Sequence, residues 1–322
     1  METKIDHFLS APPERKPLIR KGDLVQVRSV AEILATLEDN GTLEGLPFMP
    51  EMLAFCGKTF QVARRAEKTC VDGHPEAFRE FRNNDVVLLD ELRCSGVDHA
   101  GCQRGCMLFW KEAWLRRVTK QEEYSVNSDS TDRLPKKLKT STSEDQFFCQ
   151  SSQLERATQS LPRWRRFTKI YHEVRVGNKS YGEAFALFLS GIRWKLRGLF
   201  LGRFPSGPLR KTPTEALNLQ PGEWVEVKPY SEIHKTLDKA GKNRGMQFDL
   251  DMRMFCGKRY QVKRRLDRMI REDSGEMLKP KNTVILTGVD CQCIFATGGC
   301  PRAEAFYWRE IWLCRVDEPK TK

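Results

Sequence analysis

The chain has 322 residues, with 55 Lys and Arg against 43 Asp and Glu, a formal charge of +12 and 11 Cys. It contains no apolar run of about 18 residues, which excludes an ordinary transmembrane helix, and its N-terminal segment lacks the apolar region of a secretory signal. We therefore expect a globular, cytoplasmic protein. The basic balance favours an acidic partner, which is nucleic acid, anionic lipid or an acidic protein.

The sequence contains an internal repeat. Residues 22–65 align without a gap with residues 222–265, and 19 of these 44 positions are identical. A second match follows at a spacing of 198 residues, where WKEAWLRRV (110–118) corresponds to WREIWLCRV (308–316). The chain is therefore predicted to contain two copies of a domain of about 95 residues.

Composition divides the chain further. The segment after the first copy is rich in Ser, Thr and Lys, which is typical of a flexible linker. The sequence then regains apolar residues before the second copy begins. We predict five parts: an N-terminal tail (1–20), a Cys-rich first copy (21–118), a polar linker (119–146), a helical connector (147–212) and a second copy (213–322).

Each copy is predicted to consist mainly of short strands. Residues 24–27 alternate between apolar and polar, as a half-buried strand does. Ser29 and Glu32 have the spacing of a capping box, which predicts a short helix between 30 and 39. Further strands are expected at 60–62 and 86–89, and a closing strand around Trp110 and Trp114. The predicted fold class is mainly β with α: two tandem, SH3-like, partly open β-barrels joined by a partly helical connector.

The connector is predicted to contain a basic amphipathic helix. Residues 181–200 carry apolar side chains near helical spacing, and Arg193, Lys195 and Arg197 lie among them. We expect the apolar face to dock on a neighbouring domain. Peripheral contact with a membrane and contact with nucleic acid are the alternatives.

The cysteines form a framework that partly follows the repeat. Three pairs occupy equivalent positions: Cys56 and Cys256, Cys94 and Cys291, Cys102 and Cys300. Additional candidate ligands differ between the copies, and they are Cys70, His99 and Cys106 in the first and Cys293 in the second. In a chain without an export signal, such clusters more often bind metal than form disulfides.

This framework predicts metal binding, with zinc as the first choice. Zinc takes four nitrogen or sulfur ligands in a tetrahedron. In the first copy we expect them to be Cys56, Cys94, Cys102 and one of Cys70, His99 and Cys106. An iron–sulfur cluster is a less favoured alternative, and small buried apolar residues are another. The nearby cations Lys58, Arg93 and Arg104 are expected to lower the thiol pKa values.

The Phe-Cys-Gly-Lys motif, the Phe148-Cys149-Gln150 stretch and the two W-[KR]-E-x-W-L-x-R-V motifs resemble a group of uncharacterised bacterial tandem-repeat proteins. The resemblance extends from about residue 20 to 316. It implies no activity, but it adds Cys149 as a further candidate ligand. Cys314 departs from it, because a charged residue is expected there.

Three functions are compatible with these patterns. The first is a metal-stabilised tandem-domain binding or scaffold protein, favoured because the chain lacks a phosphate-binding Gly loop, a nucleophile elbow and an HExxH motif. The second is a thiolate- or metal-dependent enzyme or redox accessory of a bacterial biosynthetic pathway. The third is nucleic-acid binding, in which Arg64-Arg65 and Arg264-Arg265 contact phosphate.

Overall fold

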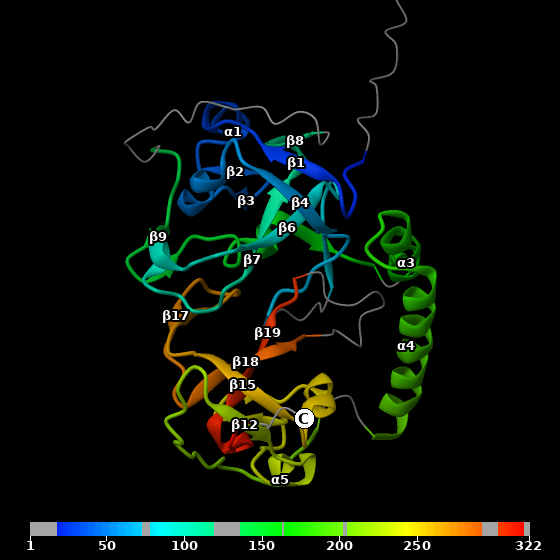
Figure 1. Ribbon diagram of the computed structural model, residues 1–322, viewed down its shortest axis with the longest axis vertical. Helices are drawn as coiled ribbons and strands as arrows, with labels where there is room; N and C mark the ends of the chain where they lie inside the picture. Colours follow the sequence, from blue (N-terminus) through cyan, green and yellow to red (C-terminus); the bar gives the residue numbers. More distant parts are fainter. Residues whose placement is uncertain are drawn as a thin grey trace, which may run out of the picture.

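The computed structural model describes residues 18–72, 78–118, 136–162, 164–201, 205–291 and 302–318. Figure 1 shows two β-rich halves arranged along the long axis of the molecule, with helices α3 (Arg165–Arg175) and α4 (Tyr181–Leu201) along one side. The predicted fold class is confirmed: the chain is mainly β, and its two halves are five-stranded antiparallel half-barrels joined by a helical middle region.

The first half-barrel has the strand order β7-β6-β4-β1-β8. Short hairpins, helical turns and strand β5 connect or flank these strands. In chain order the elements are β1 (Leu24–Val27), α1 (Val30–Thr36), β2 (Thr42–Leu43), β3 (Leu46–Pro47), the 3₁₀ helix η1 (Pro50–Phe55), β4 (Thr59–Arg65), β5 (Arg79–Phe81), β6 (Val86–Arg93), η2 (Val97–His99), β7 (Met107–Lys111), η3 (Glu112–Trp114) and β8 (Leu115–Arg117).

The second half-barrel repeats this topology with the order β19-β18-β15-β12-β20. Its elements are β12 (Trp224–Val227), α5 (Tyr230–His234), β13 (Lys242–Asn243), β14 (Met246–Gln247), η4 (Leu250–Phe255), β15 (Arg259–Arg265), β16 (Met269–Ile270), β17 (Met277–Leu278), β18 (Thr283–Asp290), β19 (Ala305–Arg309), η5 (Glu310–Trp312) and β20 (Leu313–Arg315). The strand registers also repeat, since Val25 is opposite Phe60 and Val225 is opposite Tyr260.

The two tryptophans of each repeated motif were predicted to share one closing strand, and this prediction is wrong. Trp110 lies in β7 and Trp114 ends η3, so the motif turns from one edge strand of the sheet to the other. Both indoles are fully buried, and Phe48 packs edge-on against them with ring centroids 6.2 and 5.2 Å away. Phe248 packs in the same way against Trp308 and Trp312. These aromatic clusters form the centres of the two cores.

The short helix predicted after the first strand is confirmed as α1. Ser29 Oγ accepts a hydrogen bond from the backbone N–H of Glu32, and the Glu32 carboxylate accepts one from the backbone N–H of Ser29. This reciprocal capping box satisfies two backbone donors that the first helical turn leaves free. The hydrogen bonds lower the pKa of Glu32 to about 2.

The segment 136–162 packs on the first half-barrel. It contains β9 (Ser141–Ser143), β10 (Gln146–Phe147), α2 (Leu154–Ala157) and β11 (Thr158–Ser160), and β11 pairs with β5. Leu138, Cys149 and Leu154 are buried in the core of the first half. Leu138, which was predicted to belong to the polar linker, is therefore part of this packed segment. Gly41 permits the close approach, because a Cβ there would lie 2.3 Å from the Lys137 carbonyl oxygen.

The predicted helix at 181–200 is present as α4. The prediction that its apolar face docks on a neighbouring domain is wrong for the side chains that the structure describes. Only Ala184 is buried among them, while Phe185, Leu189 and Ile192 are exposed. In the part of the chain that the structure describes, no helix is long and apolar enough to cross a membrane.

Candidate metal centre and interdomain site

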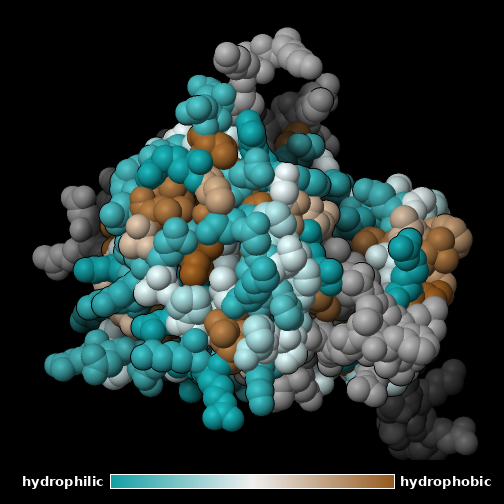
Figure 2. Space-filling view, turned by 90° about the horizontal axis from the view of Figure 1, so that it is seen from below, coloured by the Kyte–Doolittle hydropathy of each residue, from teal (hydrophilic) through white to brown (hydrophobic). Residues whose placement is uncertain are grey.

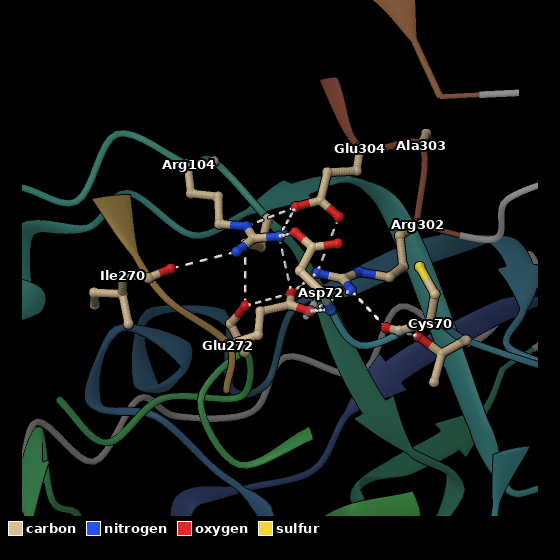
Figure 3. Close-up of polar contacts among 12 residues, drawn as sticks. Cys70, Asp72, Arg104, Ile270, Glu272, Arg302, Ala303 and Glu304 are labelled. Carbon is tan, nitrogen blue, oxygen red and sulfur yellow. Dashed lines mark hydrogen bonds and ion pairs between the residues drawn. The ribbon is translucent and has the colours of Figure 1, made fainter. Parts of the chain in front are cut away.

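The two halves meet at a group of charged side chains, drawn in Figure 3, of which all but Asp72 are largely buried. We call it the interdomain charge cluster, and it consists of Asp72, Arg104, Glu272, Arg302 and Glu304. Arg104 Nη2 lies 2.5 Å from Asp72, 3.0 Å from Glu272 and 2.5 Å from Glu304. Arg302 pairs with Glu272 and, at 3.2 Å, with Glu304. Each arginine therefore forms ion pairs with carboxylates from more than one part of the chain.

The backbone contacts of the cluster follow the repeat. Arg104 Nη1 donates to the carbonyl oxygen of Ile270 at 3.3 Å, and Arg302 Nη1 donates to that of Cys70 at 2.9 Å. Cys70 and Ile270 are 200 residues apart, and the two arginines are 198 apart. The interface is therefore pseudo-symmetric, with each half inserting the equivalent arginine into the other.

A cavity of about 20 Å³ adjoins this cluster, large enough for one water molecule or one ion. Four thiols line it: Cys94, Cys102 and Cys106 from the first half and Cys149 from the connector. His99 also lines it, and Ile270 and Arg302 contribute from the second half. The first half, the connector and the second half therefore meet around a single sulfur-rich cavity.

The loop after β6 folds tightly enough to bring these side chains together. The Cys94 N–H donates to the Cys106 carbonyl oxygen at 2.8 Å, and the Cys102 N–H donates to the His99 carbonyl oxygen at 3.1 Å. Gly96 has a φ of +74°, and a Cβ there would lie 1.9 Å from the Cys102 carbonyl oxygen. Only glycine fits this turn. The glycines of CSGVDHAGCQRGC thus position the thiols.

The histidine of this loop is oriented as a ligand would be. His99 is buried, and its Nε2 is 3.1 Å from the Phe148 carbonyl oxygen, which can only accept a hydrogen bond. The proton is therefore on Nε2, and Nδ1 carries a lone pair. Among the described residues, Nδ1 has no hydrogen-bond partner. Metal-binding histidines commonly donate their second nitrogen to a carbonyl in this way.

Glu51 is a residue near the cavity that sequence reasoning missed. One of its carboxylate oxygens, a ring nitrogen of His99 and the Cys94 sulfur all lie within 4.8 Å of one another. Glu51 Oε2 accepts from the backbone and hydroxyl of Ser95, and Oε1 is buried without a partner in the described chain. The signal available in the sequence was its repeat partner, Asp251, which is also acidic.

Burial controls the protonation of the thiols. It raises the pKa of Cys106 to about 12 and moves those of Cys94 and Cys149 upward as well. The predicted lowering of these pKa values by nearby cations is therefore wrong, because desolvation outweighs the attraction of Arg104 and Arg302 for the Cys106 thiolate. Without a metal these thiols are neutral and poorly nucleophilic at pH 7. A bound metal ion reverses this, because coordinating thiols lose their protons.

The other predicted ligands lie elsewhere. Cys56 packs against the first core and Cys70 contributes its carbonyl oxygen to Arg302, and neither is among the residues that line the cavity. In the second half, Cys256 packs against the core, and Cys293 and Cys300 lie outside the described residues. Cys291 occupies the place of Cys94, since its N–H donates to the backbone carbonyl oxygen of Glu304 at 2.7 Å, as that of Cys94 does to Cys106. Glu304 stands where the first copy has Cys106.

The arginine pairs that could contact phosphate have internal partners. Arg65 is buried and pairs with Glu112, and Arg265 pairs with Glu310 at 3.0 Å. Arg264 donates to the Arg104 carbonyl oxygen at 2.9 Å, so it supports the loop of the cavity. These three side chains stabilise the fold.

Comparisons of the chain with protein-family models, curated proteins and solved structures returned no match.

Proposed function

We propose that the protein is a zinc-stabilised tandem-domain scaffold, in which one ion joins the first half-barrel to the connector at the interface with the second. The observation that carries this proposal is the cavity lined by Cys94, Cys102, Cys106 and Cys149. Structural zinc sites are closed and use four sulfur or nitrogen ligands. A site of this kind stabilises the fold directly, because its ligands converge only in the folded state.

The geometry favours zinc over an iron–sulfur cluster. A cavity of about 20 Å³ accommodates one ion, whereas a cluster also contains several inorganic sulfides. Among the residues around the cavity, the ligand atoms that lie within 4.8 Å of one another are those of Glu51, Cys94 and His99. Cys102, Cys106 and Cys149 line the same cavity and would have to move closer to complete the set of ligands. Thiolate and imidazole donors are those that select zinc among the common divalent ions.

The surrounding charges also support the proposal. Four thiolates around a zinc ion carry a net negative charge, which needs cations nearby in a buried setting. Arg104 and Arg302 line the cavity, and Arg264 lies close enough to Cys102 and Cys106 to interact with them electrostatically.

Metal analysis of protein purified under reducing conditions tests the proposal. We expect about one zinc ion per chain. Cys94→Ser and Cys149→Ser should lose the ion and lower the melting temperature, whereas Cys314→Ser, which changes an exposed thiol, should do neither. In the cobalt-substituted protein, thiolate-to-metal charge-transfer absorption should appear and should disappear in Cys94→Ser. Metal-free protein with an unchanged melting temperature would overturn the proposal.

A further inference from the structure

Exposed apolar side chains are concentrated on the helical middle region. Of the ten large hydrophobic side chains that are exposed in the described chain, seven lie between residues 164 and 192. Five of these seven are aromatic. They are Trp164 (69 % exposed), Tyr171 (64 %), Tyr181 (82 %), Phe185 (62 %), Phe188 (37 %), Leu189 (45 %) and Ile192 (41 %). Single exposed apolar residues are ordinary on protein surfaces, but a cluster indicates a binding surface.

The α4 members of this cluster form one stripe. Phe185, Phe188 and Ile192 follow Tyr181 at intervals of four, seven and eleven residues, which places them on one face of a helix. Helix α4 packs against α3, and Figure 1 shows it standing at the side of the molecule. In Figure 2 apolar side chains gather at the edge of the molecule on that same side. We call this surface, comprising the seven residues named above, the α3–α4 apolar surface.

The helical segment that carries this surface is basic in sequence, since residues 164–201 contain eight Lys and Arg against two Glu. Lys169 is buried against Glu67 and Glu80 and does not contribute to the surface charge. Among the described side chains, the arginines exposed on the two helices are Arg175 and Arg193. An apolar stripe rich in aromatic residues on a basic helix is the pattern of a helix that lies in the plane of an anionic membrane surface. Aromatic side chains favour the interface because one end is apolar and the other can stay hydrated.

We propose that the α3–α4 apolar surface binds an anionic lipid bilayer, with α4 lying in the headgroup region. The alternative occupant is a second copy of this chain. In that arrangement the cations of one basic helix would face those of the other, and like charges in contact disfavour association. An anionic surface is complementary to the same cations and attracts them.

Vesicle sedimentation of the full chain tests this inference. The protein should sediment with vesicles of phosphatidylglycerol and phosphatidylcholine, should stay in solution with phosphatidylcholine alone, and should be released by high salt. Phe185→Ser combined with Ile192→Ser should weaken binding at least about tenfold, because both apolar side chains would be buried in the membrane interface. Arg193→Glu should also weaken binding to anionic vesicles, because it replaces an attractive charge with a repulsive one.

The matched control is Val97→Ser combined with Met254→Ser, which changes exposed apolar residues outside this surface. This control should bind as the unaltered protein does, and circular dichroism should show that all variants are folded. Absence of sedimentation, or equal weakening by both double variants, would overturn the inference. So would a dimer in light scattering that Phe185→Ser with Ile192→Ser dissociates, because the occupant would then be a second copy.

Discussion

Arg104 and Arg302 are equivalent residues of the two repeats, and each donates a hydrogen bond to a backbone carbonyl of the opposite half. Both are buried and share the carboxylates of Glu272 and Glu304. Attraction to Arg104 and Arg302 overcomes burial and lowers the pKa of Glu272 to about 2. Burial outweighs the same two arginines at Glu304 and raises its pKa. The duplicated arginine therefore holds the two half-barrels together.

Replacing Arg302 should destabilise the interface strongly. Arg302→Met leaves Glu272 with only Arg104 as a cationic partner in a fully buried position. Breaking a buried ion pair costs about 3–5 kcal/mol, because the remaining charge is left uncompensated. We expect a loss of this size in the free energy of unfolding, measured by urea denaturation.

The control for this variant is Arg315→Met. Arg315 pairs with Glu223 at 3.1 Å, and both side chains are largely solvent-accessible. Exposed pairs contribute about 0–1 kcal/mol. Equal losses in the two variants would contradict the role assigned to the interdomain charge cluster.

Gln150 should contribute strongly to the free energy of unfolding, because its side chain attaches the connector to the first half-barrel. Its side-chain amide donates to the carbonyl oxygens of Pro47 at 3.0 Å and Phe109 at 2.8 Å, and its Oε1 accepts from the Phe109 N–H at 2.8 Å. Gln150→Leu would leave three buried backbone groups unpaired, each at a cost of about 1–3 kcal/mol. We expect a loss of about 3 kcal/mol or more in the free energy of unfolding.

Gln159→Leu provides the comparison, since Gln159 is exposed and makes one long hydrogen bond to Glu80. Limited proteolysis should also cleave the connector of Gln150→Leu faster than that of Gln159→Leu. Indistinguishable stability and cleavage in the two variants would show that Gln150 does not hold the connector.

The repeat explains which parts of the fold were predictable. Strand alternation, the Ser29 cap and the duplicated motifs are local signals, and they predicted the half-barrels and α1. The cavity was only partly predictable, because Cys149 reaches it from the connector, and Ile270 and Arg302 reach it across the interface. Cys56 was chosen because it recurs in both copies, but its motif serves the turn before β4. The cavity combines recurring thiols, Cys94 and Cys102, with Cys106 and Cys149, which have no cysteine counterpart in the second copy.

A recurring hydrogen bond should stabilise both halves alike. Trp114 Nε1 donates to Thr36 Oγ1 at 3.1 Å, and Trp312 Nε1 donates to Thr236 Oγ1 at 3.0 Å. Thr36→Val and Thr236→Val keep the shape of the side chain but leave each buried indole N–H unpaired. Each should cost about 1–3 kcal/mol. Urea denaturation followed by tryptophan fluorescence would measure both losses. If neither variant lost stability, the hydrogen bond would not contribute to the stability of the core.

The acidity of Asp249 predicts how stability changes with pH. Burial, together with Asp251 and Asp72, raises the pKa of Asp249 from 3.8 to about 7. The folded protein therefore holds this proton more tightly than the unfolded chain does, so the contribution of Asp249 to the free energy of unfolding falls as the pH rises from about 4 to about 7. Asp249→Asn, which cannot ionise, should be more stable than the unaltered protein at pH 8, and the difference should shrink towards pH 4.

Asp273→Asn is a control of opposite sign, because Arg271 lowers the pKa of Asp273 and its carboxylate stabilises the folded state at neutral pH. Melting temperatures measured for both variants between pH 4 and 8 would decide the matter, and an Asp249→Asn difference that does not depend on pH would show that Asp249 ionises normally in the folded protein.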